Sequence, residues 1–434
     1  MIEFPKTAMT LLEMIESHNY DAYLVGGCVR DALLGRKTYD IDISTNMPFD
    51  MLKEIFDAYT PQFFESYGNI SFKVDQYQVE ITRFRKEGNY INHRHPSTLD
   101  FDASLFDDLE RRDFTVNALL YHREKGILDY VEGLSDLNNR VLRTIKDPLM
   151  TFQEDYLRML RLMRFKSQLN FEIEPETLKA CKTNFYKISH LSWSQIFPEF
   201  IKFIETDNFV SVCMQYPFIL SFLINEMHIA YEFDQNNRYH KYSLYEHTLR
   251  VVDQLEGKTM RLVGLFHDLG KIQTKVIKES GDYGYPGHGN VSMEIAKQYL
   301  DPSYVDRDLI LKLIANHDVS IPVDYIAMKH RVKAHGLDFM RMLIDFKRAD
   351  NIAKSEEAAY QIDKCDQYSV YLDRIEKEKP VLSLKELAVK GDDLNIDPKL
   401  KGNILNKLLE GVIDERLEND KTVLLEEVAK WDIS

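Results

Sequence analysis

Two aspartates near the N-terminus stand where they could hold a metal ion. Asp40 and Asp42 alternate with Ile41 and Ile43, and alternation along a strand places the carboxylates on one face and the isoleucines on the other. The apolar face can pack into a core, whereas two carboxylates with no basic residue between them repel each other unless a cation lies there. The run therefore indicates a divalent metal site, and two-metal phosphoryl transfer is the chemistry that such a pair performs.

The residues before this strand could bind a phosphate. Gly26 and Gly27 follow a short apolar run and precede a predicted helix over 29–34, so their backbone N–H groups can approach a phosphate without side-chain obstruction. Arg30 adds a cation in the first helical turn. Singly, paired glycines are usually a turn and an Asp-x-Asp run is usually a solvated strand edge. Together, in this order, they indicate nucleotide chemistry.

A third carboxylate is predicted close by. Residues 71–82 alternate like a hairpin with a polar turn at Asp75 and Gln76. Val79 and Ile81 would face the core, and Glu80 would point with the polar face. Two interpretations stay open: Glu80 is a third acid beside the aspartate pair, or it is a solvent-facing strand residue.

The run GGCVRD followed by DID resembles the nucleotidyltransferase signature of the poly(A) polymerase and tRNA CCA-adding family, in its bacterial-type class II. The resemblance implies that Asp40 and Asp42 hold Mg²⁺ and that Gly26, Gly27 and Arg30 cradle the phosphates. It implies Glu80 as the further catalytic acid. The expected reaction adds C and A from CTP and ATP to the 3′ end of tRNA and releases pyrophosphate.

A second motif, RRDFTVNAL, falls in residues 107–120, where a helix starting at Asp107 or Asp108 is predicted. Arg112, Asp113 and Asn117 would then lie within about one turn of each other. A cation for phosphate, with an amide and a carboxylate for ribose hydroxyls, suits a nucleotide. The run resembles the family's ribose-binding motif.

A third motif, QEDYLRMLRLMRF, predicts a helix over 153–165. Arg158, Arg161 and Arg164 recur every three residues, and cations gathered on one face call for an anion. Asp155 beside Arg158 could be an ordinary ion pair, or could present donors and acceptors like a base edge. The resemblance implies the second: Asp155 and Arg158 read the base, and Arg161 and Arg164 meet the triphosphate.

Two further segments match the family only in part. Residues 83–101 read as a loop, and in the family the loop at this place is needed for A addition. Residues 92–96, NHRHP, lack the acid and the second arginine that the family shows there. Residues 193–199 keep Ile196 and Glu199 of the next motif, and no site is predicted there.

The second half of the chain carries six residues of metal-ligand type in the order H…HD…H…H…D. Neutral imidazoles together with carboxylates suit transition metals as well as Mg²⁺ or Mn²⁺. The pattern resembles the HD phosphohydrolase superfamily, which implies a divalent metal such as Mn²⁺, Ni²⁺ or Mg²⁺. Some CCA-adding enzymes carry such a domain, and in those enzymes it acts on phosphoesters, including 2′,3′-cyclic phosphates at RNA ends. The six residues are His247, His267, Asp268, His288, His317 and Asp350.

These motifs need a fold that can position them. We predict an α+β fold, with a small mixed β-sheet nucleotidyltransferase head followed by an all-helical neck, HD domain and tail. The predicted division is 1–145, 146–225, 226–354 and 355–434. In the tail, we predict amphipathic helices over 363–379 and 384–389, and we expect Gly391 and Gly402 to interrupt the helical pattern near its end.

Composition sets limits on location and partners. The 434 residues carry a net charge of −15, so any RNA surface must be local and salt-sensitive. The four cysteines are scattered without a CxxC motif, which indicates reduced thiols and a cytoplasmic protein. No apolar run is long enough to span a bilayer. The oligomeric state stays open.

The expected function is template-independent addition of C, C and A to tRNA. A poly(A) polymerase, or an enzyme that adds only A or only CC, is the alternative within the class. An HD phosphohydrolase with an inactive, RNA-binding head is the alternative from another class.

Overall fold

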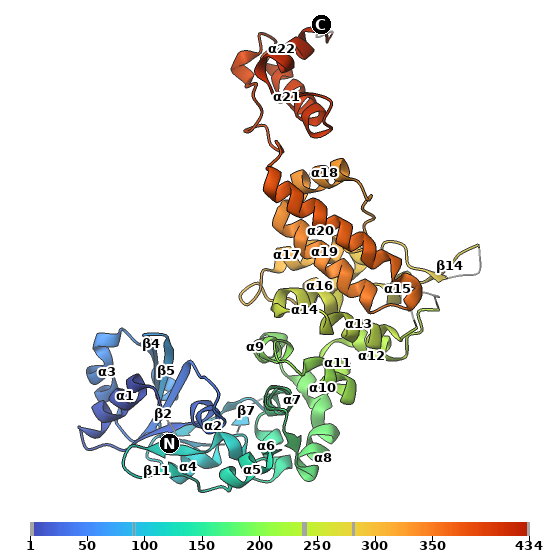
Figure 1. Ribbon diagram of the computed structural model, residues 1–434. Coiled ribbons are helices and arrows are strands. Elements are labelled where there is room, and N and C mark those ends of the chain that lie inside the picture. Colours follow the sequence, from blue (N-terminus) through green and yellow to red (C-terminus); the bar gives the residue numbers. More distant parts are fainter. Residues whose placement is uncertain (1–3, 89, 92, 237–240, 280–282, 432–434) are drawn as a thin grey trace. The chain divides into compact units, whose positions relative to one another are not determined.

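The computed structural model describes residues 4–88, 90–91, 93–236, 241–279 and 283–431 (Figure 1). The chain divides into two compact units, Met1–Ile224 and Asn225–Ser434. The predicted fold class is confirmed: a mixed sheet begins the chain, and the rest is mostly helical. The predicted division into four parts stays a prediction.

The first unit is built on a seven-stranded sheet in the order β11-β10-β1-β2-β5-β4-β3. Strands β2 and β5 run parallel, and the other pairs run antiparallel. The strands are β1 (Ala22–Val25), β2 (Asp40–Thr45), β3 (Gln62–Phe64), β4 (Asn69–Val74), β5 (Tyr77–Arg83), β10 (Leu120–His122) and β11 (Gly126–Leu128). Helices α1 (Lys6–Glu16), α2 (Gly27–Leu33) and α3 (Phe49–Phe56) pack against it.

The predicted alternation in β2 is confirmed, because Ile41 and Ile43 are buried and Asp40 is exposed. The hairpin of β4 and β5 is confirmed as well, with Asp75 in the left-handed turn at φ 51°. The segment predicted as a loop contains four two-residue strands, β6 (Lys86–Glu87), β7 (Tyr90–Ile91), β8 (His95–Pro96) and β9 (Leu99–Asp100). Asn92 lies outside the described residues.

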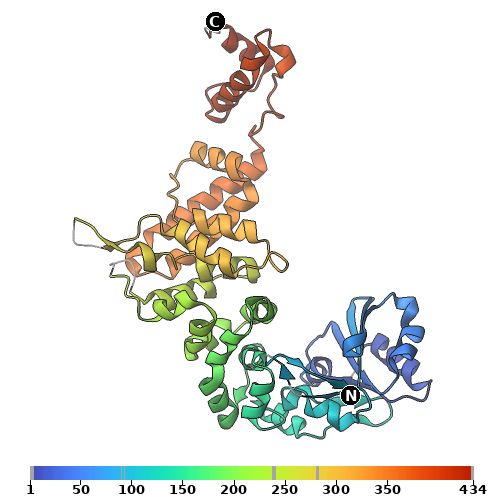
Figure 2. The same cartoon turned by 180° about the vertical axis from the view of Figure 1, so that it is seen from behind.

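Helices complete the first unit, with one short parallel strand pair among them (Figure 2). They are α4 (Leu105–Glu110), α5 (Gly133–Asn139), α6 (Pro148–Glu154), α7 (Leu157–Leu169), α8 (Pro175–Asn184), α9 (Trp193–Ile204), α10 (Phe209–Gln215) and α11 (Phe218–Leu223), with β12 (Val141–Leu142) and β13 (Glu172–Ile173).

Two helix predictions in this unit were wrong in detail. A capping box at Ser104 starts α4 three residues before Asp107, and the helix ends at Glu110. The RRDFTVNAL run then forms a bridge and a 3₁₀ turn, Thr115–Asn117. The helix predicted over 153–165 is broken at Asp155, whose extended backbone separates α6 from α7. At this break, the Asp155 carboxylate accepts a hydrogen bond from the backbone N–H of Leu157, at the start of α7.

The second unit is a bundle of helices with one short hairpin (Figures 1 and 2). Its helices are α12 (Asn225–Glu232), α13 (Leu244–Asp253), α14 (Gly257–Phe266), α15 (Lys271–Thr274), α16 (His288–Tyr299), α17 (Arg307–Asn316), α18 (Tyr325–His335), α19 (Leu337–Ile352) and α20 (Tyr360–Glu378), and its strands are β14 (Val276–Ile277) and β15 (Tyr283–Gly284).

The chain continues into α21 (Pro398–Ile413) and α22 (Lys421–Ala429), which share a small hydrophobic core with the segment before them. The helix predicted over 384–389 is wrong, because Leu387 and Val389 join that core from irregular backbone. Gly402 lies inside α21 and does not end an element. Among the described residues, no helix combines the length and apolar character that crossing a bilayer requires.

Candidate functional site

Three carboxylates meet at the edge of the central parallel strand pair. Asp42 of β2 is the direct register partner of Glu80 of β5, and Asp40 lies two residues before Asp42 on the same face. Burial, followed by the charges of Glu80 and Asp40, raises the pKa of Asp42 to about 7. Such crowding is unfavourable until a cation shares it, so the arrangement fits a divalent ion bound by oxygen ligands.

Glu80 also accepts a hydrogen bond from the Asn69 side chain at 2.6 Å and is exposed. Its placement beside Asp42 suits a third acid, and its exposure suits a solvated residue, so its catalytic role stays a prediction.

Gly26 directly follows β1, the antiparallel neighbour of β2, and lies close to the Asp42 carboxylate. Its φ of +79° lies in the left-handed region, and a Cβ there would lie 3.3 Å from Oδ2 of Asp42. Only glycine combines this backbone with so close an approach. Gly27 begins α2, and Arg30, one turn later, donates to Oδ1 of Asn117 at 2.5 Å. The predicted phosphate-binding segment therefore lies directly beside the predicted metal ligands.

The second motif reaches the same place through its 3₁₀ turn. Arg112 donates to Oγ of Ser44 at 2.9 Å, on the strand that carries Asp42. Asn117 donates to Asp113 at 3.0 Å, and Arg161 donates to the other Asp113 oxygen at 2.6 Å. Burial raises the pKa of Asp113, but Arg161 and Asn117 more than offset it and lower the pKa to about 2.

The third motif lines the far side of the site. Asp155 accepts from the Leu157 N–H at 2.9 Å and from Arg94 at 2.6 Å. Arg158 donates to Glu154 at 2.7 Å and also to the hydroxyl of Tyr90 and the backbone oxygen of Arg111. Sequence reasoning missed Arg94 as the partner of Asp155, because the two residues are 61 positions apart.

Glu199 of α9 is a second residue whose role was missed. It is buried and pairs with Arg164, and it lies 3.9 Å from Arg161. The match of Glu199 to the family motif was a usable signal, but one glutamate in a helix does not reveal which arginine it meets.

A single cavity of about 1120 Å³ collects these groups. Asp40, Asp42 and every predicted nucleotide-binding residue line its wall, and so do Arg94 and Glu199, whereas Glu80 does not. The lining residues predicted from sequence for nucleotide binding are Gly26, Gly27, Arg30, Arg112, Asp113, Asn117, Asp155, Arg158, Arg161 and Arg164. The cavity is large enough for a nucleoside triphosphate, and its lining interleaves arginines with carboxylates.

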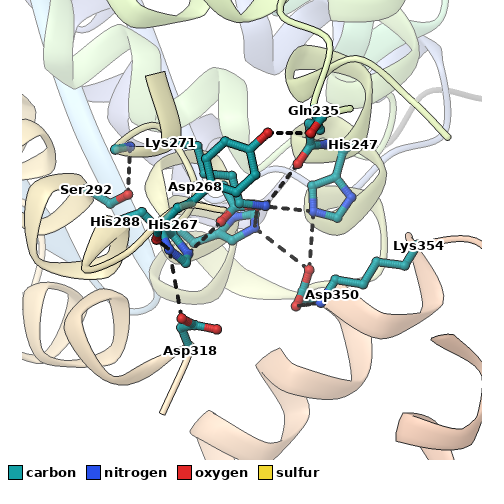
Figure 3. A network of polar contacts seen from close by, with 12 residues as sticks. Gln235, His247, His267, Asp268, Lys271, His288, Ser292, Asp318, Asp350 and Lys354 are labelled. Carbon is teal, nitrogen blue, oxygen red and sulfur yellow. Dashed lines mark hydrogen bonds and ion pairs between the residues drawn. The ribbon is translucent and has the colours of Figure 1, made fainter. Parts of the chain in front are cut away.

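The second unit holds a cluster of imidazoles and carboxylates (Figure 3). Five elements bring it together: α13, the end of α14, the start of α16, the end of α17, and α19. Two groups have ligand atoms within 4.8 Å of one another, the first being His247, His267 and Asp350, and the second being Asp268, His288 and His317. All six residues predicted as the HD ligand set are therefore gathered in one place.

The imidazoles are oriented for metal binding. Nδ1 of His267, His288 and His317 each lies 2.7–2.8 Å from a backbone carbonyl oxygen. A carbonyl only accepts, so Nδ1 carries the proton and Nε2 presents its lone pair. Nε2 of His288 and Nε2 of His317 face each other at 3.0 Å, a repulsive contact that a shared cation relieves. The donor set thus fits a divalent transition metal.

Asp268 lies at the centre of the cluster. Its Oδ1 is 3.1 Å from Nε2 of His288, and its Oδ2 is 2.6 Å from the ammonium of Lys271. Burial raises its pKa, but His267 and Lys271 more than offset burial and hold the pKa well below the usual range. Lys354 pairs in the same way with Asp350 at 2.5 Å. Sequence reasoning missed both lysines, because neither belongs to the metal-ligand residue types.

Comparisons with known proteins agree with this geometry. The family model described as "Poly A polymerase head domain" matches residues 22–143, and the model described as "HD domain" matches residues 240–368. The CCA-adding enzyme of Staphylococcus haemolyticus is 30% identical over 427 residues, which cover 98% of this chain and 96% of that enzyme. The chain belongs to the family of CCA-adding enzymes. This assignment confirms the resemblance stated from the motifs.

Further relatives support the assignment at lower coverage or identity. A CCA-adding enzyme of Staphylococcus aureus is 41% identical over 201 residues, which is 46% of this chain and 50% of that enzyme. The fold is shared with the CCA-adding enzyme of Bacillus stearothermophilus solved with CTP (TM-score 0.69, 22% identity, 97% of each chain). Membership of this family implies dependence on a divalent metal ion.

Proposed function

We propose that this chain adds C, C and A to the 3′ end of tRNA from CTP and ATP, without a nucleic-acid template. Full-length similarity to a CCA-adding enzyme is the observation that carries the proposal. A single cavity that brings the Asp40–Asp42 pair together with several arginines supports it. The alternatives of a poly(A) polymerase, an A-only or CC-only enzyme, and an inactive head are not favoured by this similarity.

The proposed reaction uses the carboxylates and the arginines that line the cavity. The RNA 3′-hydroxyl oxygen attacks the α-phosphorus of the bound nucleotide, a new P–O bond forms, and the bond to pyrophosphate breaks. When bound, Mg²⁺ ions at Asp40 and Asp42 would activate the attacking oxygen and neutralise charge on the phosphates. Among the cations that line the cavity, Arg30, Arg112, Arg161 and Arg164 are proposed to meet the triphosphate.

Base choice is proposed to rest on Asp155 and Arg158. A carboxylate accepts from the exocyclic amino group that C and A share and that U lacks, and a guanidinium donates to a ring nitrogen or carbonyl. This pair distinguishes bases without a template strand, provided that the cavity holds both side chains still. The contacts of Arg158 with Glu154 and Arg111 provide that support.

Asp155→Ala is expected to lower the preference for CTP over UTP by about 10–100-fold, since one base contact of this kind contributes about 1–3 kcal/mol. The preference is measured as the ratio of kcat/KM values on a tRNA that lacks CCA. Glu176→Ala, which removes an exposed carboxylate of α8 outside the cavity, is the control and should keep the preference. If the Asp155 variant kept the parent's preference for CTP over UTP, the proposal that Asp155 reads the base would be refuted.

Arg94→Ala is expected to tighten CTP binding by up to about tenfold. The Arg94 guanidinium occupies the Asp155 oxygen that the base amino group would use, so its removal deletes an internal competitor. Binding to the full chain is measured by calorimetry without RNA. Arg94→Lys keeps a cation there and should stay near the parent value. Weaker CTP binding in the alanine variant would mean that Arg94 assists the nucleotide.

The HD centre is proposed to hydrolyse phosphoesters, including 2′,3′-cyclic phosphates at RNA ends. The Nε2 atoms that face Asp268 and each other support a bound Mn²⁺, Ni²⁺ or Mg²⁺. Such an activity could repair a 3′ end before nucleotide addition. Purified protein that leaves a cyclic-phosphate tRNA end intact with each of these metals would refute this part of the proposal.

The experiment that tests the main proposal sizes the products on a tRNA transcript lacking CCA, with CTP alone, ATP alone and both. Two C residues followed by one A are expected. Addition of A only to a CC-ending tRNA would indicate an A-adding enzyme, and a long A ladder would indicate a poly(A) polymerase.

We propose the cytoplasm as the place of action, which the free, buried state of all four cysteines supports.

A further inference from the structure

The metal ligands of the HD domain open onto a groove between α19 and α20. This α19–α20 groove has a volume of about 330 Å³ and includes His317 and Asp350 in its wall. A second pocket of about 200 Å³ on the Lys271 side of the cluster shares both residues. The combined space exceeds what one phosphate fills and approaches the size of small-molecule sites.

The groove carries three lysines, and their tasks differ. Lys354 donates to Asp350 at 2.5 Å, and Lys347 donates to the backbone oxygen of His317 at 2.6 Å. These two therefore hold residues of the metal site in place. Lys364 of α20 has no carboxylate within ion-pair distance among the residues that the structure describes, and its ammonium lies 5.0 Å from the centroid of the Tyr360 ring.

Aromatic side chains complete the groove. Tyr360 is 50% exposed and presents a flat ring beside Lys364. Tyr368 is buried, and its hydroxyl donates to the backbone oxygen of Ile321, which ties α20 to the segment after His317. A cation without a carboxylate partner, next to an exposed aromatic ring, is a combination that binds a single nucleotide through its phosphate and base.

We propose that the α19–α20 groove binds the nucleotide on the 5′ side of the phosphoester presented to the metal ligands. Lys364 contacts the phosphate that joins the two nucleotides, and Tyr360 stacks on the base. The HD centre then takes oligonucleotide ends in preference to mononucleotides. This inference rests on the proposed phosphoester hydrolysis and names the substrate class of that site.

Protection of Lys364 from acetylation tests binding separately from hydrolysis. The full chain with divalent metal is treated with an amine-acetylating reagent in the presence of CpC carrying a 3′-phosphonate, in which carbon replaces the ester oxygen, or of the matching mononucleoside phosphonate. Peptide mass spectrometry should show that only the dinucleotide slows Lys364 acetylation, at least about fivefold. Lys377, an exposed lysine on the same helix, is the control. Equal protection by both probes, or by neither, would overturn the proposal.

Lys364→Ala should raise KM for hydrolysis of 3′-phosphorylated CpC about tenfold, the effect of losing one charge-assisted contact. Its KM for 3′-CMP should change less than twofold. Lys364→Arg should restore the value, and Lys377→Ala should not alter it. Equal KM changes on both substrates would contradict the groove. If neither substrate is hydrolysed while Lys364 is still protected by the dinucleotide, the hydrolysis proposal fails and the groove stands.

Discussion

Asp42→Asn is expected to lower the rate of both C and A addition by at least about a thousandfold, because the carboxylate is a proposed ligand of the ions that stabilise the transferring phosphate. The variant should fold at least as stably as the parent in metal-free buffer. Burial, Glu80 and Asp40 raise the pKa of Asp42 to about 7, so the neutral amide removes an unfavourable charge. Single-turnover addition and thermal unfolding measure the two effects.

Asp50→Asn is the matched control for this variant. Asp50 is exposed on α3, and its 93% exposed side chain lies outside the cavity. Its replacement should change the rates of C and A addition less than twofold. It should change the free energy of unfolding by less than about 0.5 kcal/mol, as for other surface substitutions. Normal nucleotide addition by Asp42→Asn would contradict the proposal that Asp42 is a ligand of the catalytic metal ions.

Asp268→Asn should abolish metal binding by the HD centre and lower phosphoester hydrolysis by about a thousandfold. The Asp268 carboxylate faces His288 through one oxygen and Lys271 through the other, and an amide replaces one acceptor with a donor. Metal content is measured by elemental analysis of the purified chain, and hydrolysis on a cyclic-phosphate RNA end. Nucleotide addition should change less than twofold.

Asp373→Asn is the control for the HD centre. Asp373 is exposed on α20, pairs with Arg341 and lines neither pocket beside the predicted ligands. It should keep metal content and hydrolysis near the parent values. Full metal content in the Asp268 variant would show that this carboxylate is no ligand.

Residue types and local periodicity determined much of this protein by themselves. Alternation placed the Asp40 and Asp42 side chains opposite Ile41 and Ile43, because successive strand residues point to opposite faces. The hairpin at Asp75 followed from the same rule. The gathering of the six residues predicted as HD ligands was foreseeable as well, because few residue types can bind a metal and their order along the chain is distinctive.

Tertiary structure alone decided which groups meet. The Ser104 capping box moved the start of one predicted helix to Leu105, and the break at Asp155 divided another into α6 and α7. Capping and packing override propensity at helix ends. The pairs Arg94–Asp155 and Arg164–Glu199 join residues 61 and 35 positions apart, a separation that no local pattern encodes. Lys364 likewise gained its place beside the predicted metal ligands only because α19 and α20 pack together.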